Sequence, residues 1–144
     1  MTSIQAALAL GATLACAIAD ARTGLIPNRL TYPALAAIAS AAALSGTLCF
    51  SCLGAFCVGG SLLLLHCITH GRGLGLGDVK LGTCIGAGLG PLSGMLALGS
   101  SFILGGAVGS YLLLTHRAHR KTPIRFGPFL ALGACIALAC GTLR

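Results

Sequence analysis

The 144-residue chain is 56% hydrophobic and only 8% charged, whereas soluble domains carry about 25% charged residues. This composition excludes an ordinary soluble domain and indicates an all-α, polytopic membrane helix bundle. At about 20 residues a crossing, the chain accommodates about six transmembrane helices in one membrane-embedded domain over residues 1–144. The net charge of +7 does not indicate nucleic-acid binding, because the basic residues are scattered and no aromatic-rich face accompanies them.

The first apolar run covers residues 1–19 and ends at Asp20. A secretory signal would begin with positive charge, which this run lacks, so we expect a retained helix. Helical spacing places small residues on the side of Asp20 and bulky residues opposite: Ala6, Ala9, Thr13 and Cys16 against Leu10, Leu14 and Ile18. Small residues mark packing faces in membrane helices, so Asp20 is predicted to point into the bundle.

A polar connection over residues 21–29 leads into apolar sequence from 30 to 69, which is too long for one crossing. The turn residues at 45–47 divide it into two antiparallel helices. His66 and His70 lie near the end of the second and are interpreted as interfacial polar anchors rather than ligands.

The glycine-rich stretch at 71–81 contains Asp78, the only other acidic residue. A fourth helix is predicted from there to 88–91, a fifth over 94–115 and a sixth over 126–143. Gly82, Gly86 and Gly90 form a row of small residues that begins at Asp78 and predicts close helix packing. Ile85 and Leu89 share part of that face, so the inward orientation of Asp78 is less clear than that of Asp20.

The basic residues predict the orientation in the membrane. Counting crossings places eight of the nine on one side: Arg22, Arg29, Arg72, Lys80, Arg117, Arg120, Lys121 and Arg125, with Arg144 opposite. The positive-inside rule makes that side cytoplasmic. Both termini are then non-cytoplasmic, and Asp20 and Asp78 both lie at the cytoplasmic boundary.

The eight cysteines mostly lie in apolar runs, where free Cys behaves as a small hydrophobe. Cys49 and Cys52 form a single C-x-x-C, which is weak evidence for zinc or a redox pair. We therefore predict neither a metal nor a cofactor.

Two carboxylates at one membrane depth suit an aspartic protease, in which one accepts a proton from water and the other, protonated, polarises the scissile carbonyl. Such a pair titrates as a unit. Two Asp residues are also compatible with proton or cation ligands in a small multi-pass transporter or channel. The pairing alone leaves both possibilities open.

Three local motifs favour the first possibility. Gly75-Leu76-Gly77-Asp78 is a G-x-G-D sequence, Asp20 is followed by Ile26-Pro27-Asn28, and Phe126-Gly127-Pro128-Phe129-Leu130 comes late in the chain. In this order they resemble the motifs of type IV prepilin peptidases.

The resemblance implies cleavage of the short basic leader from a pilin-like precursor with a hydrophobic helix, at the cytoplasmic boundary of a bacterial inner membrane. Asp20 and Asp78 match the catalytic pair. Gly75 and Gly77 are interpreted as residues that let an extended substrate approach, or as a simple entry turn to the helix. Lys80, Pro27 and Asn28 are further candidates for binding substrate or shaping the loops, with lipid headgroup contact as the alternative for Lys80.

The chain departs from the family in one respect. Many members carry an amino-terminal segment with paired C-x-x-C motifs that is associated with methylation of the new amino terminus. Nothing precedes the first predicted helix, and Cys49 and Cys52 fall elsewhere. We therefore expect a minimal peptidase core, which puts methyltransferase activity in doubt, with pilin-like precursors and membrane lipids as partners.

Overall fold

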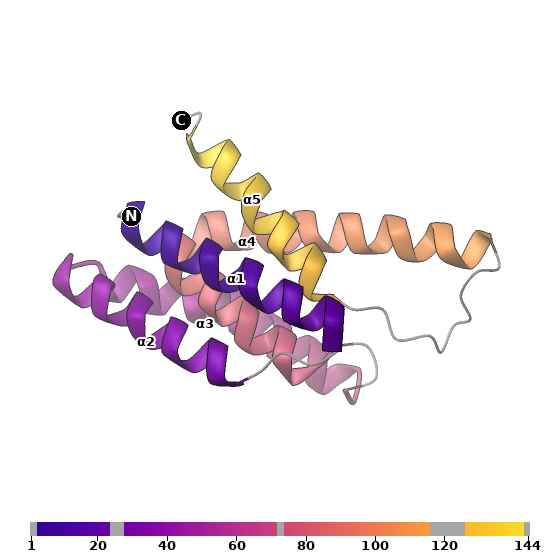
Figure 1. The fold of residues 1–144 in the computed structure, drawn as a ribbon, viewed down its shortest axis with the longest axis horizontal. Helices are drawn as coiled ribbons and strands as arrows, with labels where there is room; N and C mark the ends of the chain where they lie inside the picture. Colours follow the sequence, from indigo (N-terminus) through magenta and orange to yellow (C-terminus); the bar gives the residue numbers. More distant parts are fainter. Residues whose placement is uncertain (1–2, 24–27, 72–73, 116–125, 143–144) are drawn as a thin grey trace.

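The computed structural model describes residues 3–23, 28–71, 74–115 and 126–142. Within these ranges every regular element is a helix, which confirms the all-α prediction. The order is α1 (Ser3–Thr23), α2 (Asn28–Leu44), α3 (Leu48–Ile68), α4 (Leu76–Leu114) and α5 (Gly127–Thr142), gathered in one bundle (Figure 1).

The predicted turn between the second and third apolar segments is confirmed. α2 ends at Leu44 and α3 begins at Leu48, and Gly46 between them has a φ of 68°, a conformation that glycine adopts without strain. The end of α1 lies further along the chain than the apolar run suggested. α1 continues through Thr23, so Asp20 belongs to its last turn.

The packing face predicted for α1 is the buried one. Ala9, Thr13 and Cys16 are at most 2% exposed, and Asp20 is buried in line with them. Ile18 on the opposite side is 55% exposed. The spacing of small residues therefore did identify the side of α1 that enters the bundle.

The break predicted at 88–91 occurs inside α4. Gly90 has φ 76° and ψ 178°, a backbone conformation that is essentially restricted to glycine. A Cβ at this position would also overlap the ring of Phe50. Pro91 follows, and proline suits the first position of a helix because no N–H is needed there.

The two arms of α4, residues 76–89 and 91–114, turn back beside each other at this break. A Cβ built on Gly94 would lie 3.1 Å from the Cα of Gly86. Residues eight apart in a straight helix are separated by about 12 Å. The two arms of α4 thus correspond to the predicted fourth and fifth helices.

The first arm of α4 packs most closely against α3. A Cβ on Gly54 would overlap the carbonyl oxygen of Gly86, and the reverse substitution meets the Gly54 carbonyl. Beside this contact, Ser51 Oγ donates a hydrogen bond to the Ala87 carbonyl over 2.7 Å. The row of small residues that begins at Asp78 therefore packs against another helix, as predicted.

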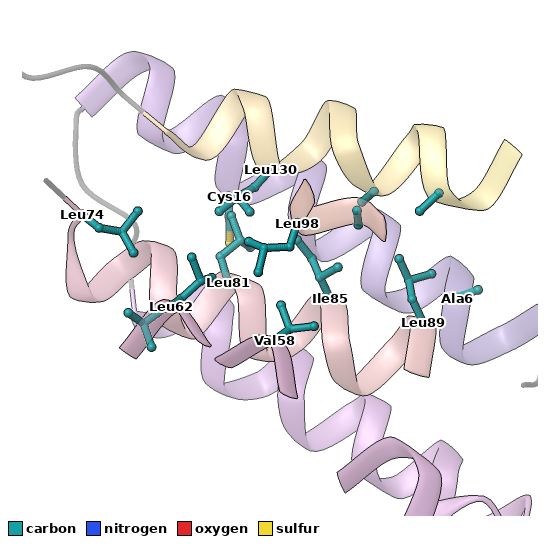
Figure 2. Packing of buried hydrophobic residues seen from close by; sticks show 14 residues of the cluster. Ala6, Cys16, Val58, Leu62, Leu74, Leu81, Ile85, Leu89, Leu98 and Leu130 are labelled. Carbon is teal, nitrogen blue, oxygen red and sulfur yellow. The ribbon is translucent and has the colours of Figure 1, made fainter. Parts of the chain in front are cut away.

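The neighbouring face of the same arm is also covered. Leu81, Ile85 and Leu89 are buried in one cluster with residues of α1, α3, the second arm of α4 and α5 (Figure 2). This explains the mixed pattern after Asp78, because a helix covered on both faces has no exclusively small packing side.

Successive helices run in opposite directions, so the end of one helix lies near the start of the next. The end of α1, the start of α2 and the connection between α3 and α4 lie at one end of the bundle, together with the start of α5 (Figure 1). Both termini and the α2–α3 turn lie toward the other end. By length and composition, α1, α3 and α4 could each cross a membrane, while α5 contributes the shorter apolar stretch Gly127–Gly141.

We expect Gly54→Ala to destabilise the protein by about 1–3 kcal/mol, because the added methyl group meets backbone that cannot rotate away. Thermal unfolding in detergent measures the effect. Gly60→Ala is the matched control on the same helix, since nothing lies within 4 Å of its added Cβ. Equal stability of the two variants would contradict the close α3–α4 contact.

Candidate functional site

Asp78 is held at the start of α4. It is the third residue of that helix, and its Oδ2 accepts a hydrogen bond of 3.1 Å from the backbone N–H of Gly75. The carbonyl of Gly75 accepts in turn from the N–H groups of Asp78 and Val79. This is the acidic half of a capping box, in which a side chain in the first turn reaches back to the residue before the helix.

Asp20, in the last turn of α1, is held against the start of a different helix, α5. Its Oδ2 accepts a hydrogen bond of 3.1 Å from the backbone N–H of Gly127, the first residue of α5. A Cβ on Gly127 would lie 2.6 Å from that oxygen. Only glycine therefore lets the carboxylate approach this backbone without a shift of one or the other.

The two carboxyl groups lie at the same end of the bundle, near the end of α1 and the start of α4. Asp20 is 6% and Asp78 9% exposed, and they are close enough for the charge of Asp20 to act on Asp78. Each accepts a backbone N–H at a helix N-terminus, where the helix dipole favours negative charge. The arrangement provides two oriented, nearly buried carboxyl groups with different helices supporting them.

Lys80 and Asn28 also meet. Lys80 Nζ donates a hydrogen bond of 2.8 Å to Asn28 Oδ1 and lies 5.1 Å from the centre of the Tyr32 ring, within the range of a cation–π contact. Both partners belong to α2, so Lys80 ties the first turns of α4 to the start of α2. The structure thus brings two of the predicted residues, Lys80 and Asn28, into direct contact.

The remaining predicted residues contribute less to this geometry. Gly77 is half-buried in the first turn of α4, between Gly75 and Asp78. Pro27 lies outside the residues that the structure describes. Of the two predicted glycines, Gly75 is thus the one that bonds directly to a carboxylate.

Gly127 is the site residue that the sequence interpretation left without a role. It stands in the motif at 126–130, which was noted only as part of a family resemblance. The signal that could have identified it is a glycine in the first turn of a predicted helix, since the first N–H groups of a helix are unpaired and can bind an anion.

The described ranges contain no group of three or more His, Cys, Asp or Glu side chains that could hold a metal ion. Cys49 and Cys52 are exposed at the start of α3. That end of α3 lies away from the end where α1 finishes (Figure 1).

Comparison with known families agrees with the motifs. The model of the type IV leader peptidase family matches residues 7–110. The chain belongs to this family. The matched range contains Asp20, Asn28, Asp78 and Lys80, while Gly127 lies beyond it.

Curated relatives carry the name prepilin leader peptidase/N-methyltransferase. The protein from Burkholderia pseudomallei (strain 1026b) is 36% identical over 140 residues, 91% of this chain and 44% of the relative. That from Aeromonas hydrophila is 33% identical over 132 residues, covering 81% and 42%, and that from Bacillus subtilis (strain 168) is 34% identical over 127 residues, covering 87% and 51%. The chain spans about half the length of these relatives. Among solved structures, none matches the chain significantly.

Proposed function

We propose that this chain is the core of a membrane aspartic endopeptidase that removes the leader from type IV prepilin or pseudopilin precursors. The observation that carries the proposal is the presence of two nearly buried carboxyl groups, Asp20 from α1 and Asp78 from α4, at the same end of the bundle in a member of the leader peptidase family. The names of the relatives supply the substrate class.

In the proposed reaction, one carboxylate takes a proton from a water molecule, and the water oxygen attacks the scissile carbonyl carbon. The other carboxyl group, protonated, donates to the carbonyl oxygen as it becomes negative. Collapse of the tetrahedral intermediate breaks the C–N bond, and the leaving amine takes a proton. The products are a leader with a new carboxylate and a mature protein with a new amino terminus.

The backbone donors at the site favour hydrolysis over the transporter alternative. The positive ends of α4 and α5 point toward Asp78 and Asp20 through the N–H groups of Gly75 and Gly127. Positive dipole ends disfavour a cation at the same place. They do hold one oxygen of each carboxyl group in a constant position, which general acid–base catalysis requires.

The proposal extends to the membrane. We infer six crossings, with the two arms of α4 counted separately, both termini outside and the carboxylates at the cytoplasmic boundary of a bacterial inner membrane. Arg22 and Arg29 are exposed at the carboxylate end of the bundle. Positive charge there supports a cytoplasmic orientation, which is the side on which a basic leader would be present before cleavage.

Replacing either carboxylate tests the chemistry. Asp20→Asn and Asp78→Asn should each lower cleavage of a purified pilin precursor by at least about 100-fold, because the amide neither accepts nor donates the required proton. Gel analysis of precursor and product in detergent measures the rate. Thr13→Val, a buried substitution on the same face of α1, should leave the rate within about twofold. Cleavage that survives either Asn substitution would disprove the paired mechanism.

Gly127→Ala tests the support of Asp20 without changing a carboxylate. The added methyl group would displace Oδ2 from the first N–H of α5, so we expect cleavage to fall by about tenfold or more, since small misplacements of reacting groups are costly. Gly141→Ala on the same helix is the control, because nothing lies within 4 Å of its Cβ. A rate in Gly127→Ala equal to that of the control would show that the contact is dispensable.

Thiol labelling tests the orientation. In a chain whose other cysteines are replaced by alanine, we expect Cys49 to react with a membrane-impermeant maleimide added to intact spheroplasts. A single cysteine introduced as Arg22→Cys should react only after lysis. Cys49 is exposed near the start of α3 and Arg22 is exposed near the end of α1, and these two helix ends lie at opposite ends of the bundle (Figure 1). The reverse labelling pattern would contradict the proposed topology.

A further inference from the structure

His66 makes a specific contact outside its own helix. It lies in the last turn of α3, and its Nδ1 is 2.7 Å from the carbonyl oxygen of Leu74. Because a carbonyl only accepts, Nδ1 carries the proton and His66 is the donor. The bond joins residues eight positions apart and links the last turn of α3 to the residues just before α4.

The accepting carbonyl belongs to the peptide unit that supports Asp78. The same unit, Leu74 C=O and Gly75 N–H, donates from its other side to Asp78 Oδ2 over 3.1 Å. A trans peptide is planar, and its C=O and N–H point in opposite directions. His66 and Asp78 therefore hold one peptide unit between them, and hydrogen bonds in such a chain polarise one another.

The loop fits the His66 ring closely. Gly71, with a φ of 71°, donates its N–H to the His66 carbonyl over 2.9 Å. A Cβ on Gly71 would lie 3.1 Å from Cε1 of the ring. The ring thus packs against one part of the loop while it bonds to another, which restricts its orientation.

Leu74 fixes the peptide unit from the other side. It is 4% exposed and belongs to the buried cluster that contains Leu62 (Figure 2). Its side chain anchors the residue in the core, while its carbonyl faces His66. Rotation of the peptide would break the His66 bond or the Asp78 bond.

We infer that His66 is a positioning residue for Asp78, which it orients through the Leu74–Gly75 peptide unit. The inference rests on the proposed function, because it assigns His66 a role in the reaction only if Asp78 takes part in it. His66 itself need not touch substrate. Its loss would alter the orientation of one catalytic carboxyl group rather than the binding of the precursor.

Three substitutions at position 66 distinguish loss of the hydrogen bond to Leu74 from a general loss of packing. In His66→Asn the amide nitrogen occupies the place of Nδ1 and can still donate to Leu74. In His66→Gln it lies one atom further out, and His66→Leu has no donor. We expect His66→Leu and His66→Gln to lower kcat for a pilin precursor by about tenfold or more with KM within about twofold, and His66→Asn to recover most of kcat.

His70→Asn is the matched control. His70 is exposed in the same loop and has a φ of 49°, which asparagine tolerates. This variant should have the kcat of the wild type. A wild-type kcat in His66→Leu, or equal recovery by Asn and Gln, would overturn the inference.

A measurement without substrate distinguishes failure of this inference from failure of the proposed function. In protein labelled with 15N-glycine, the hydrogen of the Gly75 amide should exchange with solvent at least about tenfold faster in His66→Leu than in the wild type. The exchange rate should be unchanged in His70→Asn. Unchanged exchange in His66→Leu would overturn the positioning role, whatever the activity. Cleavage by Asp78→Asn would instead refute the proposed function and leave the hydrogen-bond chain standing.

Discussion

The structure depends on how two carboxyl groups are accommodated inside an apolar bundle. A carboxylate that is buried among apolar side chains is costly unless it is hydrogen-bonded, and these two are the only acidic residues of the chain. Asp20 and Asp78 each accept a backbone N–H that a helix N-terminus leaves without a partner. The same bonds offset the cost of burial and orient the groups. Stability and the proposed chemistry therefore draw on the same two contacts.

Close packing by glycine makes that arrangement possible. Gly54 and Gly86 let the backbones of α3 and α4 meet, and Gly90 lets α4 turn back on itself. As a result the first arm of α4 is surrounded by other helices and its first residues lie among them. Bulkier residues at the α3–α4 contact would force the arm outward and move Asp78 with it. Packing far from the carboxylates thus helps to set their separation.

The connections at the carboxylate end add a second layer of support. Lys80 holds the start of α4 to α2 through Asn28 and Tyr32, and His66 holds the peptide unit behind Asp78. Both contacts join an element that carries or precedes a carboxylate to a neighbouring helix. Polar side chains are costly in apolar surroundings and are retained there with defined partners.

The amino-acid sequence by itself determined the class of structure, most helix boundaries, the break near Gly90 and the identity of the two carboxylates. Apolar segment length, turn residues and the rarity of acidic groups are local properties, and they need no knowledge of the fold. It also identified the buried face of α1, because small residues recur there at helical spacing. The extension of α1 past Asp20 was missed because the helix was expected to end with the apolar run, although no helix breaker stands between Asp20 and Gly24.

The partners of the carboxylates were decided only by the tertiary structure. Gly127 is 107 positions from Asp20, and His66 acts on Asp78 through a peptide unit that no sequence pattern marks. Such hydrogen bonds depend on the distances between packed helices, and those distances follow from the whole set of contacts rather than from any one segment.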